Sequence, residues 1–316
     1  GRGLRPSPGP TKHCAAARRS LIRSLNNHTE MGSDLHFLVV DGYSKEGRAG
    51  LEAGGATTAG MLYRQMLEHH SPGCTVDILY PADPGVSLPA GTALESYDGL
   101  AWTGSSLTVW KETDPDVLPQ LELAKEAFRQ QVPSFGSCWA AQIGIVAAGG
   151  RCVAHPFGRE MGIARKIELT SEGRAHPLYM GKTTVFDAFI SHDDEITHLP
   201  PGALCLASNS YTRVQAVSIT HQGGVMWAIQ YHPEYDLHEL ARLMHCRTEK
   251  LITLGFFQDQ PDAARYIQRL ESLHQSPGRK DLAWQLGIDA DVMNPDVRQI
   301  EVRNWIDHLV IPNCNN

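Results

Sequence analysis

The chain has 316 residues and a mass of 34.7 kDa, is 42% hydrophobic and 20% charged, and carries a net charge of −7. These values are typical of a globular protein with a sizeable core, and the mild acidity gives nucleic acid or an anionic membrane no attraction, so neither is expected as a partner. Because no apolar run approaches the roughly 20 residues that span a bilayer, and no apolar signal follows the N-terminal basic residues, the expected location is cytoplasmic.

Residues 1–30 mix proline, glycine and arginine with little apolar periodicity, and they are predicted to form a flexible N-terminal extension. From residue 35, short apolar runs alternate with helical patterns, which predicts strands and helices layered as a parallel sheet covered on both faces. The glycine-rich residues 47–60 are interpreted as a mobile loop over the carboxyl ends of the strands. The expected strands are 35–41, 75–81, 97–106 and 132–138, and the expected helices are 57–70, 118–131 and 139–150.

The second half of the chain is richer in strand patterns and then turns helical. Residues 31–245 are therefore predicted to form one domain, and residues 246–316 a helical C-terminal appendage. Short β-branched or aromatic runs stand at 164–170, 183–191, 203–210, 214–220 and 225–233, and helical periodicity at 237–256, 262–275, 280–287 and 295–310.

Seven cysteines are spread along the chain without a disulfide or metal pattern. They stand at positions 14, 74, 138, 152, 205, 246 and 314, and none belongs to a C-x-x-C or zinc-type spacing. Most are expected to be reduced and inert, and no metal site is predicted.

Cys138 differs from the other six because of its local sequence, VPSFGSCWAAQIG. An apolar strand runs through Gly136 to the cysteine and a helix begins directly behind it, which is the arrangement of a nucleophile elbow. The helix N-terminus favours a thiolate, and the free N–H of Trp139 can donate to an oxyanion. On the elbow alone, a buried structural cysteine is an equally good interpretation.

A thiol nucleophile needs a base and a group that orients the base. His232 and Glu234 follow the apolar run VMWAIQ, and two residues apart in an extended segment their side chains leave on the same face. The sequence therefore predicts Cys138 as nucleophile, His232 as base and Glu234 as the orienting carboxylate.

The pair FGSCWAAQ and IQYHPEYD resembles the class I glutamine amidotransferase family, whose members carry a G-x-C-x-G-x-Q elbow and a later Q-[FY]-H-P-E motif. The stretch ISHDDEI at 190–196 is similar to one in the amidotransferase domain of GMP synthetase. The resemblance covers about residues 35–245, with Ala140 where the family has its second glycine. It implies an α/β, flavodoxin-like three-layer sandwich with a mostly parallel central sheet, followed here by the helical appendage.

The resemblance also implies site residues. It maps further oxyanion-hole N–H donors onto Gly104 and Ser105, and substrate contacts onto Gln142, His192 and Asp193. For Gln142 an exposed helix residue is an equal alternative. A second pair, Arg159 and Glu160, is interpreted either as a neighbour of the glutamine pocket or as a turn salt bridge.

The implied reaction is hydrolysis of the L-glutamine side-chain amide through a glutamyl thioester, which needs no cofactor and releases ammonia. No P-loop or SGGxDS-type loop for ATP appears in the sequence. The ammonia is therefore expected to pass to a separate synthetase or acceptor subunit, or the protein is a plain glutaminase, or it cleaves γ-glutamyl bonds in peptides.

Two further interpretations compete. The chain is also similar to homoserine O-acyltransferases, which use Cys, His and Glu to move an acyl group from a CoA thioester, although it lacks their opening stretches. A catalytically silent scaffold is disfavoured because Cys138, His232 and Glu234 are all present.

Overall fold

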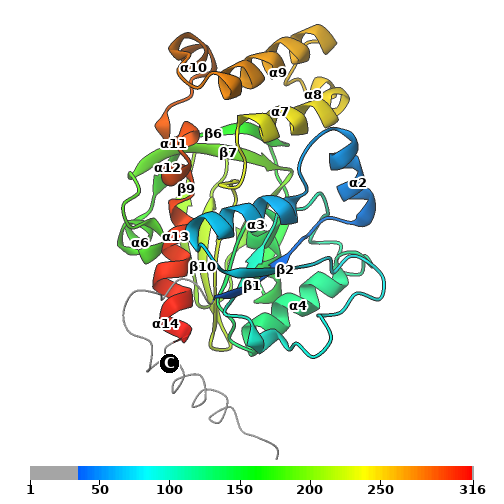
Figure 1. Cartoon of the computed structure of the whole chain (residues 1–316), viewed down its shortest axis with the longest axis vertical. Helices are drawn as coiled ribbons and strands as arrows, with labels where there is room; N and C mark the ends of the chain where they lie inside the picture. The colour runs from blue at the N-terminus through cyan, green and yellow to red at the C-terminus, as the bar shows by residue number, and fades with distance from the viewer. Residues whose placement is uncertain (1–34, 315–316) are drawn as a thin grey trace, which may run out of the picture.

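The computed structural model describes residues 35–314, so the extension expected at residues 1–30 lies outside the described part. A mixed nine-stranded sheet forms its centre (Figure 1). The sheet strands are β1 (His36–Val40), β2 (Thr75–Leu79), β3 (Gly99–Trp102), β4 (Ser134–Ser137), β6 (Glu160–Leu169), β7 (Val185–His192), β9 (Ala203–Ser208), β10 (Ala216–His221) and β11 (Gly224–Ile229). Two more strands, β5 (Arg151–Ala154) and β8 (Asp194–His198), pair antiparallel in a small separate sheet.

The strand order is β2-β1-β3-β4-β11-β10-β9-β6-β7. The first five strands in this order pair in parallel, and the pairings from β11 through β7 are antiparallel. The α/β fold class is confirmed. The strands of the parallel part alternate with helices along the chain, whereas the β-rich second half of the sequence supplies the antiparallel part, since hairpins need no helical crossover.

The described helices cover the sheet and extend beyond it. They are α2 (Lys45–Ala53), α3 (Ala59–His70), α4 (Leu118–Arg129), α5 (Trp139–Ala147), α6 (Ser171–Ala175), α7 (Leu237–Cys246), α8 (Thr248–Thr253), α9 (Gln260–Gln275), α10 (Lys280–Leu286), α11 (Ala290–Met293), α12 (Pro295–Arg298), α13 (Ile300–Trp305) and α14 (Ile311–Cys314). Short turns of other helix types are η1 (Leu94–Ser96), η2 (Pro177–Tyr179) and the π-helical η3 (Ile306–Val310). No helix in residues 35–314 is long and apolar enough to cross a membrane.

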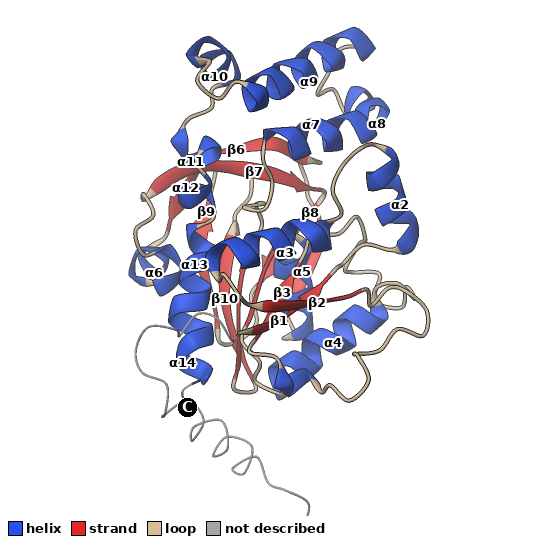
Figure 2. Cartoon of the chain, in the orientation of Figure 1, coloured by secondary structure: helices blue, strands red, loops and turns tan. Residues whose placement is uncertain are grey.

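Strand alternation divides the core between the two faces of the sheet. In β1, Leu38 and Val40 pack with residues of α4 and α5, whereas Phe37 and Val39 pack with residues of α3 and α13. Figure 2 shows α3 lying in front of the strands. A third apolar cluster joins α7, α9 and α10 to the sheet, and these helices lie above β6 and β7 in Figure 1.

The last helices pack directly on the sheet. Trp305 of α13 is fully buried, with its ring centroid 5.6 Å from that of Phe37 and 5.7 Å from that of Phe135. A Cβ on Gly99 would lie 2.8 Å from the Trp305 ring, so this glycine lets the indole lie against β3. The C-terminal helices predicted from periodicity are present, and the domain boundary at residue 245 stays a prediction.

Two sequence expectations need correction. Residues 47–60 are not one loop, because α2 occupies Lys45–Ala53: the Ser44 hydroxyl caps it by accepting from the Gly47 N–H at 3.2 Å, and Leu51 is buried. The helical pattern at 237–256 is not one helix either. Arg247, with φ −114° and ψ 14°, breaks it into α7 and α8.

Candidate active site

Cys138 stands at the sharp turn between β4 and α5. Its φ of 53° and ψ of −98° form a conformation that residues other than glycine rarely adopt. The Cys138 N–H donates to the Ile229 carbonyl at 2.7 Å and so ties the turn to β11. A Cβ on Gly136 would lie 2.3 Å from the Trp102 carbonyl oxygen, so only glycine fits there. The fold thus presents a thiol at a helix N-terminus.

His232 and Glu234 lie just beyond β11. Nδ1 of His232 donates to Oε1 of Glu234 at 2.8 Å. The Tyr235 ring stacks on the imidazole, with centroids 4.1 Å apart and an interplanar angle of 4°. Nε2 of His232 is buried and has no hydrogen-bond partner within residues 35–314. The imidazole is therefore held with one nitrogen on the carboxylate, while the other remains available for a reacting group.

The thiol of Cys138 and the imidazole of His232 approach each other beside Gly104. A Cβ on this glycine would lie 3.0 Å from His232 Cε1 and 3.7 Å from Cys138 Cβ. Burial alone lowers the pKa of His232, but the Glu234 carboxylate and the neighbouring thiol outweigh burial and raise the pKa to about 10. An imidazolium in this place is the partner that a thiolate nucleophile needs.

A second donor reaches Glu234 from inside the protein. The Ser137 hydroxyl donates to Oε1 of Glu234 at 3.0 Å, and the Tyr63 hydroxyl donates to Ser137 Oγ at 2.7 Å. The Glu234 side chain is buried, so these bonds fix its orientation. No local sequence pattern assigns this role to Ser137 or to Tyr63, which comes from α3.

The residues predicted to supply oxyanion donors lie around Cys138. Ser105 is held by its hydroxyl, which donates to the Gly42 carbonyl at 2.7 Å. The Gly104 carbonyl accepts from the Thr103 hydroxyl at 2.8 Å. Trp139 is the first residue of α5. In the described part of the chain, the backbone N–H groups of Gly104, Ser105 and Trp139 donate to no protein acceptor, so each is available to a developing oxyanion.

Cys138 and His232 open into a small cavity of about 100 Å³. Most of its walls are polar, and both charge signs are represented. The lining residues are Tyr43, Ser105, Ser106, Leu107, Thr108, Cys138, Gln142, Arg159, Ser191, His192, Asp193, Asp194, His232, Arg247 and Lys250. The cavity therefore places cationic and anionic side chains next to the Cys138 thiol.

The three residues predicted to contact substrate all line this cavity, but two of them are held by the protein. The Gln142 amide nitrogen donates to the Asp194 carbonyl and to the Gln230 side chain, both at 3.4 Å. His192 is bonded at both ring nitrogens, to the Asp194 carbonyl at 2.8 Å and to Glu160 at 3.0 Å. These bonds give Gln142 and His192 a clear role in shaping the wall, and a substrate contact stays a prediction.

Asp193, the third predicted residue, joins two cations. Arg159 donates to its Oδ2 at 2.5 Å, and Lys250 donates to the same oxygen at 3.0 Å. Although burial tends to raise the pKa of Asp193, the two cations outweigh it and lower the pKa. Arg159 thus lies in the cavity wall, and its ion pair is with Asp193 rather than with Glu160, which the turn interpretation had made its partner.

Sequence reasoning missed Arg247 and Ser191 as cavity residues. The Arg247 guanidinium donates to the Ser191 hydroxyl at 2.8 Å, and the Ser191 carbonyl oxygen lies 3.5 Å from the Cys138 sulfur. Arg247 stands inside a helical pattern where its helix-breaking backbone could not be foreseen, so no local signal marks it.

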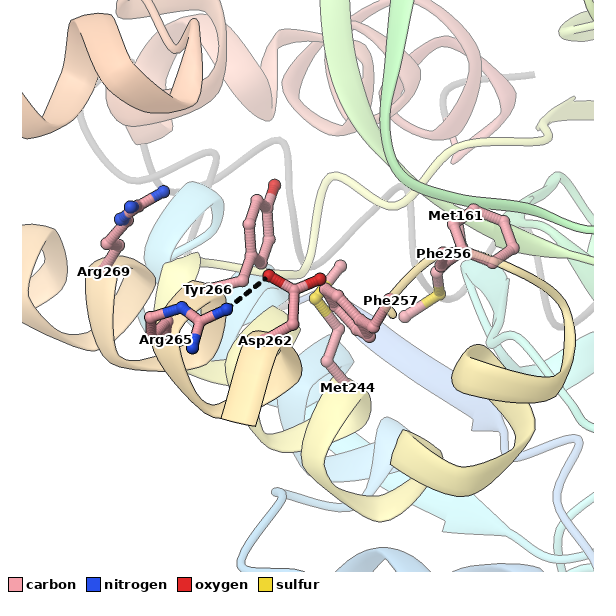
Figure 3. Close-up of a pocket in the computed structure, with 8 residues that line it drawn as sticks. All are labelled: Met161, Met244, Phe256, Phe257, Asp262, Arg265, Tyr266 and Arg269. Atoms are coloured by element: carbon pink, nitrogen blue, oxygen red, sulfur yellow. Dashed lines mark hydrogen bonds and ion pairs between the residues drawn. The ribbon is translucent and has the colours of Figure 1, made fainter. Parts of the chain in front are cut away.

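A separate cavity of about 290 Å³ lies between β6 and the helices α7 and α9 (Figure 3). Its wall is partly aromatic, and Asp262 and Arg265 form an ion pair at 3.2 Å at one side. None of its lining residues is a cysteine or histidine. No group of three or more metal-ligating side chains is found within residues 35–314.

The chain is similar to a known protein family and to enzymes that act on γ-glutamyl compounds. The family described as glutamine amidotransferase class-I matches residues 111–245. A gamma-glutamyl-L-1-hydroxyisopropylamide hydrolase from Pseudomonas sp. is 32% identical over 285 residues, which cover 88% of this chain and 94% of that protein. Gamma-glutamyl peptidase 3 from Arabidopsis thaliana is 28% identical over 152 residues, 47% of this chain and 59% of the peptidase.

Other similar proteins are matched over a smaller share of their own length, or are similar in fold alone. A GMP synthase from Clostridium novyi is 28% identical over 195 residues, 61% of this chain but only 35% of the synthase. Among solved structures, a glutamine amidotransferase from Thermotoga maritima superposes with a TM-score of 0.61 at 16% identity, covering 90% of this chain and 99% of that one. At this identity the superposition supports the fold and carries no statement about substrate.

Proposed function

Because the chain belongs to the class I glutamine amidotransferase family, we propose that it hydrolyses γ-glutamyl amides, cleaving the bond between a glutamyl γ-carbonyl and an amine. The observation that carries the proposal is that Cys138 and His232 line one small polar cavity, while the buried Glu234 carboxylate accepts from the other nitrogen of the His232 imidazole. The near full-length similarity to a γ-glutamyl amide hydrolase supports an amine, rather than ammonia alone, as the leaving group.

In the proposed first half-reaction, the Cys138 thiolate attacks the γ-carbonyl carbon. The N–H of Trp139, with that of Gly104 or Ser105, stabilises the oxyanion that forms. The His232 imidazolium then gives its proton to the amine nitrogen, the carbon–nitrogen bond breaks, and the amine leaves. The pKa of His232, raised to about 10 by Glu234 and the thiol against the opposing effect of burial, keeps this proton in place at neutral pH.

The second half-reaction removes the acyl group. Neutral His232 takes a proton from water, the resulting hydroxide attacks the thioester carbon, and the sulfur leaves as thiolate. The products are glutamate and the free amine, so the atoms of one amide and one water are accounted for. Glu234 holds the imidazole in one tautomer through both halves.

A glutaminase that supplies ammonia to a separate acceptor subunit is the second candidate. The match to the amidotransferase family and to the GMP synthase supports it. The two candidates share every step above and differ in the amine that leaves, so substrate preference distinguishes them. Homoserine acyl transfer would instead need succinyl-CoA as donor, and an assay with that donor and homoserine tests it.

The test compares L-glutamine with γ-glutamyl isopropylamide and γ-glutamyl p-nitroanilide as substrates for the purified chain. We expect the substituted amides to be hydrolysed with the higher kcat/KM, and Cys138→Ala to lower the rate by about 10⁴-fold or more. Hydrolysis that survives Cys138→Ala would overturn the proposal. A preference for glutamine, strengthened by an added partner protein, would favour the second candidate.

A further inference from the structure

Two arginines donate to one hydroxyl in the wall of the catalytic cavity. The Ser191 Oγ accepts from Arg159 Nη2 at 2.7 Å and from Arg247 Nη1 at 2.8 Å. The arginines come from distant parts of the chain: Arg159 immediately precedes β6, and Arg247 lies between α7 and α8. Two guanidinium groups on one neutral oxygen repel each other, so a nearby anion would stabilise the arrangement.

The cavity wall holds three cationic side chains, Arg159, Arg247 and Lys250, and two carboxylates, Asp193 and Asp194. Arg159 and Lys250 share the single carboxylate of Asp193, and Arg247 forms no ion pair within residues 35–314. The Arg159 Nε is buried and has no acceptor in that part of the chain, although its side chain is 6% exposed. Asp194, the other acidic residue in the wall, forms no ion pair within residues 35–314 and accepts from the Trp110 indole at 3.2 Å.

Ser191 also links these cations to the nucleophile. Its carbonyl oxygen lies 3.5 Å from the Cys138 sulfur, while its hydroxyl holds both guanidinium groups. Ser191 therefore lies between the two guanidinium groups and the sulfur of Cys138. In a glutamyl group, two methylenes separate the γ-carbonyl from the carbon that bears the α-carboxylate, so a substrate bound to Cys138 carries its anion into the same small cavity.

We infer that Arg159 and Arg247 form a carboxylate clamp for the α-carboxylate of the γ-glutamyl substrate. The inference rests on the proposed function and adds its specificity: the acyl group must carry a free α-carboxylate. A guanidinium group favours a planar carboxylate, and the Arg159 Nε has no acceptor among residues 35–314. The clamp accepts γ-linked glutamyl compounds and rejects a glutamine residue inside a peptide, whose α-carboxyl is an amide.

The experiment uses two substrates that differ at one group, L-γ-glutamyl p-nitroanilide and its α-carboxamide. For the unmodified protein we expect kcat/KM to be roughly 10- to 100-fold lower on the α-carboxamide, the range for losing a hydrogen bond to a charged group. Equal rates on the two substrates would contradict the inference that the arginines bind the α-carboxylate, and would not contradict the proposed hydrolase function.

The variants Arg159→Met and Arg247→Met are then measured on both substrates. We expect a loss of about 10- to 100-fold with the free carboxylate, mainly as a higher KM, and rates within about twofold of the unmodified protein with the α-carboxamide. A purely structural role would lower both rates equally and would contradict the inference. Arg279→Met, which removes an exposed arginine paired with Asp281, is the matched control and should leave both rates unchanged.

Two further measurements keep the test decisive if a variant folds poorly or if no hydrolysis is found. Arg247→Lys retains the charge without the planar fork and should recover part of the lost affinity. Calorimetry of Cys138→Ala with L-glutamate and with its α-amide tests the clamp without turnover. Tighter binding of L-glutamate would support the clamp even if the proposed hydrolysis fails, and equal binding would overturn it.

Discussion

The hydroxyl of Ser137, the residue immediately before Cys138, donates to Oε1 of Glu234 at 3.0 Å. That oxygen also accepts from Nδ1 of His232. The residue next to Cys138 thus helps to hold the carboxylate that accepts from the His232 imidazole. Because Ser137 and Cys138 are joined by one peptide bond, the positions of Cys138 and His232 are coupled through Glu234.

We predict that Ser137→Ala lowers kcat/KM by about 3- to 30-fold, because the buried carboxylate loses a donor and the Tyr63 hydroxyl loses its acceptor. The kinetics of the purified variant check this. Ser134→Ala is the control, since the hydroxyl of this buried serine of β4 donates to the Val132 carbonyl and to no other acceptor within residues 35–314. Equal losses in the two variants would show that the effect is general damage to the strand.

The pH dependence of acylation should reflect His232. Its pKa is raised from 6.5 to about 10 by Glu234 and Cys138, against the opposing effect of burial, so the imidazolium that protonates the leaving amine is lost as pH rises through about 10. We expect kcat/KM to fall on the basic side near that pH, and Glu234→Gln to move the fall to lower pH. Measuring kcat/KM against pH for both proteins tests the prediction. A fall at the same pH in Glu234→Gln as in the unmodified protein would contradict it.

The same raised pKa has a consequence for stability. A group whose pKa is higher in the folded state stabilises that state fully below its unfolded value, near 6.5, and the contribution is lost as pH rises through about 10. Urea unfolding of the unmodified protein should therefore show a midpoint that declines across this interval, and a smaller decline in His232→Gln. Identical declines in the two proteins would assign the effect to other groups.

A buried ion pair anchors α13 behind the site. Lys182 lies 2.9 Å from Glu301, both side chains are at most 2% exposed, and the Tyr231 hydroxyl donates to Glu301 at 2.6 Å. We predict that Glu301→Met lowers the free energy of unfolding by about 3–5 kcal/mol, because it leaves a buried ammonium unpaired. The double change Lys182→Met with Glu301→Met should recover much of this loss.

Chemical denaturation measures both variants. Glu122→Ala is the control, because its pair with Lys125 is exposed and should contribute about 1 kcal/mol or less. A Glu301→Met protein as stable as the control would show that the network does not anchor α13.

Glycine substitutions test the elbow. In Gly136→Ala the new Cβ would meet the Trp102 carbonyl at 2.3 Å, so we expect loss of stability and activity together. Gly50→Ala in α2 meets nothing within 4 Å and should stabilise the protein by about 0.5–1 kcal/mol. Thermal unfolding and activity of both proteins check the contrast, and a fully active Gly136→Ala would show that the turn can relax.

Local patterns predicted much of the fold and the core of the site. The strand through Ser137 and the helix from Trp139 follow from apolar runs and periodicity, and the bond between His232 and Glu234 follows from two-residue spacing in an extended segment. The helix α2 was not predicted because its two glycines indicate a loop, although Ser44 caps the helix and Leu51 is buried.

The sequence by itself determined which residues carry reactive groups and which of them are close neighbours along the chain. Only the tertiary structure decided that Arg159 and Arg247 meet at Ser191, and that Tyr63 stands behind Ser137. The physical reason is separation along the sequence. Hydrogen bonds within a turn are set by backbone geometry over a few residues, whereas these contacts join residues far apart in the chain and depend on how the helices pack on the sheet. Cys138 could be singled out from the sequence, but the charges that surround it could not.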